Sequence, residues 1–227
     1  MESYISEKIE VSQTLLIRKV YVWMCAALLI TGVTAYRVSG SEELLRMIFS
    51  SKISFFGIII AQFALVWFLT SRIKTLSFST ATILFAVYSV LMGVTMSCIF
   101  LAYTQSSIAS TFLITAGTFA VMSIYGFTTK RDLTSIGGLL VMALIGLIIA
   151  SLVNYFLKSS MFDLVISCIG VLIFVGLTAY DTQKIKALIN QENTEENQKM
   201  AIIGSLMLYL DFINLFLFLL RIFGRRR

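Results

Sequence analysis

The stretch AIIGSLMLYLDFINLFLFLLRIFG, residues 201–224, decides the fold because it is long and apolar enough to cross a bilayer. It carries one carboxylate, Asp211, near its middle. At about 1.5 Å of rise per helical residue, Asp211 lies more than about 10 Å from either end of the stretch. An ionisable group at that depth costs about 3 kcal/mol or more. We therefore expect Asp211 to face a protein interior or a water-filled cavity and to have a partner.

The composition is that of an integral membrane protein. Of the 227 residues, 58% are hydrophobic and 13% are charged, and the mean hydropathy is +0.91. The net charge of +6 comes from basic residues between the apolar runs, where they set membrane topology rather than contact nucleic acid. The sequence contains no histidine, which excludes Ser-His and Cys-His nucleophile pairs and the usual catalytic zinc ligands. We expect neither a nucleic-acid partner nor a bound cofactor, and no enzymatic activity.

Seven apolar runs predict an all-α integral membrane protein, a seven-transmembrane helix bundle. In chain order they are residues 20–38, 53–71, 76–103, 108–128, 136–157, 164–180 and 201–224. The prediction is one membrane domain, residues 20–224, with an N-terminal tail of residues 1–19 and a basic C-terminal tail of residues 225–227. Small residues inside the runs predict close helix packing: Gly93, Gly117, Gly137, Gly138 and Gly146.

Lysine and arginine are unevenly divided between alternate loops. With the N terminus in the cytoplasm, ten of them fall in cytoplasmic segments and four in outer loops, which favours that orientation. The tail of Arg225, Arg226 and Arg227 then lies outside, against the same rule. Either the last run is a full span or it enters the membrane and returns, and we favour the full span.

Two aspartates are the candidate functional residues. Of the twelve acidic residues, only Asp181 and Asp211 lie within or at the edge of a membrane run. Asp181 ends the sixth run in FVGLTAYDTQKIK, on the side where the seventh run begins. Asp211 lies deeper by residue count. Contact between them therefore requires the seventh helix to begin outside the hydrocarbon or the sixth helix to extend further inward.

Two further residues are candidates to support the aspartates. Asn214 lies one helical turn from Asp211 and can hydrogen-bond to it. Arg72, at the cytoplasmic end of the second run, is a basic residue that could pair with Asp181. Both residues also have simpler interpretations. The polar pair of Asn214 and Asp211 can merely fix helix packing, and Arg72 can be an ordinary cytoplasmic loop residue.

Three segments resemble motifs of the Bax inhibitor-1 family, which has small bacterial members: GSLMLYLDFINLFLFLLRIFG, FVGLTAYDTQKIK and TAGTFAVMSIYGFTTKRDL. The resemblance covers nearly the whole chain. It implies a bundle with the last helix central, acting as a pH-sensitive calcium leak, here in a bacterial inner membrane. It also implies an aspartate dyad at Asp181 and Asp211, which are candidate calcium contacts, with Arg72 as a latch. Family members often have a proline shortly after the glycine of the third run, where this proline-free chain has Cys98 and Ile99.

Three functions are compatible with these residues. In a channel or leak, two nearby carboxylates cannot both ionise at low cost, so they share a proton and change the helix contact when it is lost. A membrane interaction protein that regulates a protease or a stress or cell-death pathway would depend on the N-terminal tail instead. An intramembrane aspartyl protease fits poorly, because the chain has YLD before Phe212 where such proteases have GxGD, and it lacks their proline motif.

Overall fold

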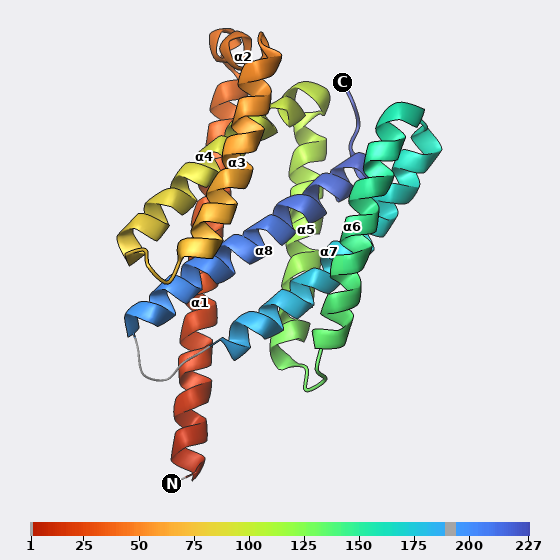
Figure 1. Cartoon of the computed structure of the whole chain (residues 1–227). Helices are drawn as coiled ribbons and strands as arrows, with labels where there is room; N and C mark the ends of the chain where they lie inside the picture. The colour runs from red at the N-terminus through yellow and green to blue at the C-terminus, as the bar shows by residue number, and fades with distance from the viewer. Residues whose placement is uncertain (1, 189–193) are drawn as a thin grey trace. The chain divides into compact units, whose positions relative to one another are not determined.

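The computed structural model describes the backbone of residues 2–188 and 194–227, and the side chains of residues 13–51, 53–188 and 195–227. Residues 189–193 of the long polar loop before the last run lie outside this description. The described residues form helices and no strand (Figure 1). The helices are α1 (Glu2–Ser39), α2 (Glu42–Phe49), α3 (Lys52–Arg72), α4 (Phe78–Ala102), α5 (Gln105–Thr128), α6 (Thr134–Leu157), α7 (Ser160–Ala187) and α8 (Thr194–Phe223).

The predicted all-α fold with seven membrane helices is confirmed. Every helix except α2 contains a stretch long and apolar enough to cross a membrane. The last one, α8, is the most buried, with 67% of its apolar window buried against 11% to 39% for the other six. This burial confirms the prediction from Asp211 that the last helix is enclosed by protein rather than by lipid.

The chain is divided into two compact units. Unit 1 consists of Met1–Ala102 and Leu188–Leu206, and unit 2 consists of Tyr103–Ala187 and Met207–Arg227. The helix α8 is uninterrupted, so its first part belongs to unit 1 and its second part, from Met207 onward, belongs to unit 2.

In unit 1, α1 and α4 pack closely because α4 has a glycine at the contact. A Cβ on Gly93 would lie 2.6 Å from the carbonyl oxygen of Thr31. The Thr31 hydroxyl donates a hydrogen bond of 3.0 Å to the carbonyl oxygen of Ser89. On another face of α4, Gln62 of α3 donates a hydrogen bond of 2.6 Å to Thr95 Oγ1. Small residues and satisfied polar groups thus join these helices, as is usual in lipid.

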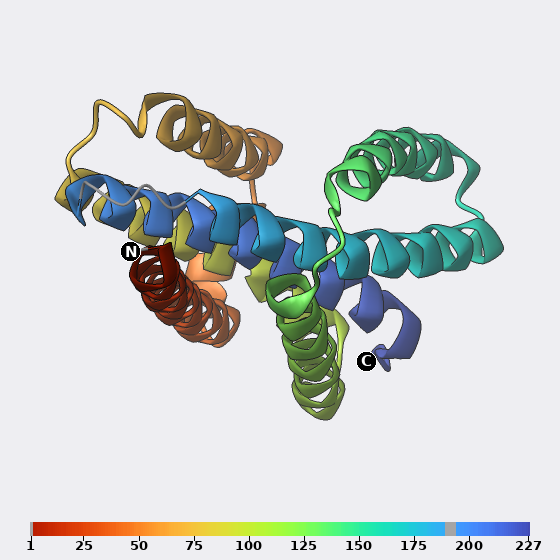
Figure 2. The ribbon, with the colours of Figure 1, turned by 90° about the horizontal axis from the view of Figure 1, so that it is seen from below.

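In unit 2, α6 and α7 form an antiparallel pair, which Figures 1 and 2 both show. A Cβ on Gly137 of α6 would lie 2.5 Å from the ring of Tyr180, and a Cβ on Gly176 of α7 would lie 2.6 Å from Leu140. The second part of α8 packs against this pair in one apolar core. Its buried members are Leu147, Ile166, Ile173, Phe174, Leu177, Leu215 and Leu219.

The structure corrects several sequence predictions. Gly93 and Gly137 lie at helix contacts, but a Cβ on Gly117, Gly138 or Gly146 would meet nothing within 4 Å. A glycine allows close packing only where another helix lies opposite it, and the sequence does not show which face is covered. The connection between the first two runs also contains an unpredicted helix, α2, capped by Ser41, whose side chain accepts a hydrogen bond from the Leu44 N–H.

Candidate functional site

The side chains of Asp181 on α7 and Asp211 on α8 lie within hydrogen-bonding reach of each other in unit 2. A hydrogen bond between two carboxyl groups requires that one of them carries a proton. The sequence places Asp211 deeper in the membrane than Asp181. The two residues can still meet because both helices extend beyond their apolar runs. Helix α7 continues past Asp181 to Ala187, and α8 begins at Thr194, well before the apolar stretch.

The two aspartates differ in exposure. Asp211 is 5% exposed, whereas Asp181 is partly buried. The Oδ2 atom of Asp211 is buried and receives no hydrogen bond from a donor group of the described residues. Buried polar atoms are nearly always satisfied, and an exception calls for a specific role such as proton or cation binding. We refer to Asp181 and Asp211 together as the carboxyl pair.

Aromatic packing holds α8 beside α5 at the level of the carboxyl pair. Phe212, the residue after Asp211, packs edge-on against Phe112 and Phe119 of α5, with ring centroids 5.3 and 5.4 Å apart. Further along α5, Ser123 has a buried Oγ atom without a hydrogen-bond partner among the described residues. The packing of Phe212 against α5 thus helps to fix the position of Asp211.

Lys184, which the sequence indicates only as a topology residue, is a neighbour of the carboxyl pair. It lies three residues after Asp181 on α7, and its charge acts on the Asp181 carboxyl. Its ammonium nitrogen lies 5.7 Å from the centre of the Tyr180 ring. The spacing of three residues on a helix was the available signal, because such residues share a face.

Asn214 interacts differently from the prediction. Its Nδ2 donates a hydrogen bond of 2.8 Å to the carbonyl oxygen of Leu210, one turn earlier on its own helix. No hydrogen bond from Asn214 to Asp211 occurs among the described residues. A polar side chain within a helix can satisfy itself locally in this way, so Asn214 does not pair with the buried carboxyl oxygen of Asp211.

A second carboxylate in α7 is paired with arginine. Asp163, which the sequence placed in a loop, lies in the first turn of α7, and Arg221 of α8 lies 3.8 Å from it. Their side chains are 40% and 43% exposed. An ion pair this exposed contributes little to stability, about 0–1 kcal/mol. Asp163 therefore differs from the carboxyl pair in both partner and environment.

Arg72 is the last residue of α3 and lies in unit 1, with an exposed side chain. The carboxyl pair lies in unit 2. Among the described residues, Arg72 has no salt bridge within 4.0 Å. Its pairing with Asp181 stays a prediction.

Comparison with known proteins finds relatives of this chain among bacterial membrane proteins. The family model described as inhibitor of apoptosis-promoting Bax1 matches residues 13–227. The inner membrane protein YbhL of Escherichia coli (strain K12) is 51% identical over 212 residues, which cover 92% of this chain and 91% of YbhL. An uncharacterized protein of Borreliella burgdorferi is 52% identical over 211 residues, covering 92% of this chain and 91% of that protein. An uncharacterized membrane protein of Streptococcus pyogenes serotype M1 is 42% identical over 184 residues, covering 81% and 80%.

Proposed function

The chain belongs to the Bax inhibitor-1 family of membrane proteins, and from this membership we propose that it is a pH-sensitive calcium leak gated by Asp181 and Asp211. The observation that supports the proposal is the proximity of two carboxyl groups, which lie within hydrogen-bonding reach of each other on neighbouring membrane helices. By its likeness to YbhL, named as an inner membrane protein, we place the chain in a bacterial inner membrane. We orient the N terminus toward the cytoplasm from the charge distribution.

The proton held between the carboxyl groups is the proposed pH sensor. While one proton is shared, a hydrogen bond joins α7 to α8 and the pair carries a single negative charge. Loss of that proton leaves two negative charges within contact distance in a poorly hydrated site, where repulsion is strong. The contact between the two helices then becomes unfavourable, so the protonation state of the pair sets whether the helices stay together.

Calcium suits the same two groups as a passing ion. Carboxylate oxygens are its preferred ligands, but a resident site takes six to eight oxygens. The carboxyl pair supplies four at most, and the described residues contain no group of three or more Cys, Asp or Glu that could hold a metal. A site with so few ligands favours transient contact with the ion over tight binding. A leak requires transient contact because the ion must leave as well as enter.

Purified protein in liposomes loaded with a calcium-sensitive dye tests this function. We expect calcium entry that depends on pH for the wild-type chain, and a flux that no longer depends on pH for Asp211→Asn. Asp163→Asn is the matched control, because it removes a carboxylate from α7 that is exposed and paired with Arg221. Its pH dependence should equal that of the wild type. Calcium entry no faster than in empty liposomes at every pH would reject the leak and favour an interaction protein.

A further inference from the structure

Unit 2 contains a cavity of about 350 Å³ where α5 ends, α6 begins and α7 ends. We call it the basic cavity. It is separate from the buried carboxyl oxygen of Asp211, and it takes its walls from the connection between α5 and α6 and from the last turns of α7. The polar residues that matter are Lys130, Arg131, Asp132, Tyr180, Gln183 and Lys184.

The walls of the basic cavity are held in place by hydrogen bonds. Gln183 accepts a bond of 2.8 Å from the Leu133 N–H and donates one of 2.8 Å to the carbonyl oxygen of Arg131. Asp132 Oδ1 accepts a bond of 2.9 Å from the N–H of Thr134 at the start of α6. The connection between α5 and α6 is therefore fixed to α7, which gives the cavity a defined shape.

The charge of the basic cavity is positive. Three cations, Lys130, Arg131 and Lys184, line it together with one carboxylate, Asp132, which leaves a net charge of 3 − 1 = +2. The hydrogen bonds from Thr134 lower the pKa of Asp132, so this group is ionised near neutral pH. No salt bridge joins these three cations to a carboxylate among the described residues. Lys186, just outside the lining, differs because its ammonium donates to the carbonyl oxygen of Phe127 at 3.0 Å.

The basic cavity lies beside apolar surface. Two of the first residues of α6, Ile136 and Leu139, are 51% and 66% exposed. In a membrane helix such side chains face acyl chains, so a lipid at this position can place its phosphate among the cations and its chains along α6. Basic pockets between the ends of membrane helices are known to recognise anionic headgroups. We propose that the basic cavity binds the phosphodiester headgroup of an anionic phospholipid.

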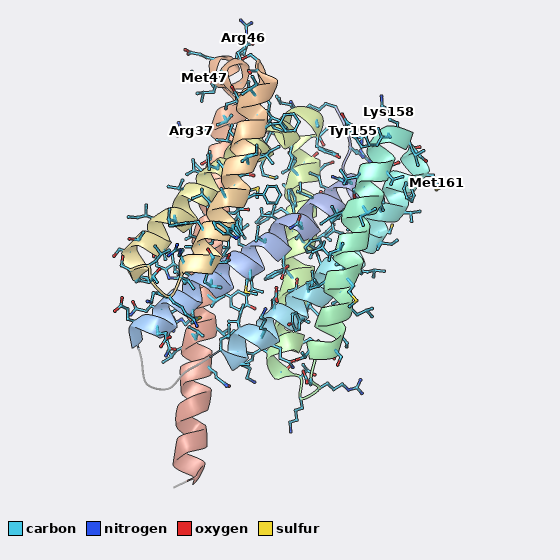
Figure 3. All side chains as sticks on the ribbon, viewed as in Figure 1. Arg37, Arg46, Met47, Tyr155, Lys158 and Met161 are labelled. Atoms are coloured by element: carbon cyan, nitrogen blue, oxygen red, sulfur yellow. The ribbon has the colours of Figure 1, made fainter. Side chains whose placement is uncertain are left out.

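Lipid retention by the purified full-length protein tests this site. The protein in detergent is mixed with equal amounts of phosphatidylglycerol and phosphatidylcholine, and bound lipid is counted by native mass spectrometry. We expect a clear preference for phosphatidylglycerol in the wild type. The double variant Lys130→Gln, Arg131→Gln should lose it, by about fivefold for each cation removed. The control is Arg37→Gln, Arg46→Gln, which removes two exposed cations from unit 1 (Figure 3) and should keep the preference.

A variant that is expected to bind the lipid more tightly distinguishes a specific loss of lipid binding from a loss of folding. Asp132→Asn keeps an oxygen that can accept the Thr134 N–H but removes the one negative charge of the cavity, so it should bind phosphatidylglycerol several-fold more tightly. Equal retention of both lipids by the wild type, equal losses in the two double variants, or no gain in Asp132→Asn would each overturn the proposal. A second experiment adds inorganic phosphate in excess, to compare a soluble anion with the lipid headgroup. If it occupies the cavity and phosphatidylglycerol does not, the ligand is a soluble anion and the lipid assignment is wrong.

Discussion

The backbone of Gly126 on α5 lies directly against the backbone of Ala179 on α7, so that a Cβ on Gly126 would overlap the Ala179 carbonyl group. The obstacle is main chain, which cannot move aside as the end of a flexible side chain can. Ala179 is two residues before Asp181, so this contact sets the distance between α5 and the part of α7 that carries Asp181.

Gly126→Ala should therefore destabilise the protein. The added methyl group has to push α5 and α7 apart, and overpacking of this kind costs about 1–3 kcal/mol. The matched control is Gly117→Ala on the same helix, where a Cβ meets nothing within 4 Å. Thermal unfolding in detergent measures both. We expect a lower midpoint for Gly126→Ala and no loss for Gly117→Ala, and equal midpoints for the two variants would contradict the close contact.

Asp181 and Asp211 should behave as a unit in calcium flux. Replacing either by asparagine removes the shared proton, so each single variant should flatten the pH dependence to a similar extent. The double variant should then add almost nothing, because no pair remains to be disrupted. Flux is measured across pH in dye-loaded liposomes for all four proteins. If the effects of the two replacements sum as independent changes, the two carboxyl groups do not share a proton.

Arg72→Ala tests the proposed latch. If this arginine holds the carboxyl pair in a closed arrangement, its removal should raise the flux by about fivefold, the lower end of typical coupling between sites. Lys74→Ala is the control, since it removes an exposed cation two residues away from the same end of α3. A flux and a pH midpoint for Arg72→Ala that both match the wild type would leave Arg72 with a role in topology alone.

The position of the C terminus can be tested by labelling. The Arg225 carbonyl oxygen accepts a hydrogen bond of 3.1 Å from the Thr104 N–H, and the Arg225 N–H donates one of 3.0 Å to Ser107 Oγ. The tail thus lies where α5 begins (Figure 1), at the opposite end of α5 from Lys130 and Arg131. With that basic connection in the cytoplasm, the tail should lie outside.

A single cysteine added after Arg227 serves as the probe, in a chain in which Cys25, Cys98 and Cys168 are replaced by serine. In right-side-out spheroplasts an impermeant thiol reagent should label it at once. Lys130→Cys in the same background is the control and should react only after the membrane is permeabilised. The reverse pattern would place the tail in the cytoplasm.

The number of spans and the burial of the last helix could be predicted from the sequence because each depends on local properties. Every run is continuously apolar. A carboxylate inside one of them must be shielded from lipid by the surrounding protein. The ends of α7 and α8 could not be placed by hydropathy alone. The polar sequence after Asp181 continues α7 because Thr182 and Ile185 are both fully buried. These two residues are three apart, which is helical spacing, so periodicity could have extended the helix.

Features that depend on distant parts of the chain were not predictable. Gln183 satisfies the backbone of Leu133 and Arg131, about fifty residues away, and nothing near Gln183 in the sequence indicates those partners. The importance of Gly126 and the irrelevance of Gly117 to packing likewise depend on which helix lies opposite each of them. The charge around the basic cavity was visible only as a topology signal, because its cations come from two distant parts of the chain, the connection between α5 and α6 and the last turns of α7.

The shared last helix has a consequence for biosynthesis. Unit 1 needs Leu188–Leu206 and unit 2 needs Met207–Arg227, so neither unit is complete until the final part of the chain has been made. Ordinary multidomain chains can finish their first domain while the ribosome translates the next. Here the first helices enter the bilayer before α8, which packs against them, has been synthesised. The hydrogen bond between Ser107 in the first turn of α5 and the Arg225 N–H also forms only after Arg225 has been made. Nascent chains that stop before residue 194 should therefore depend on membrane chaperones and be degraded quickly.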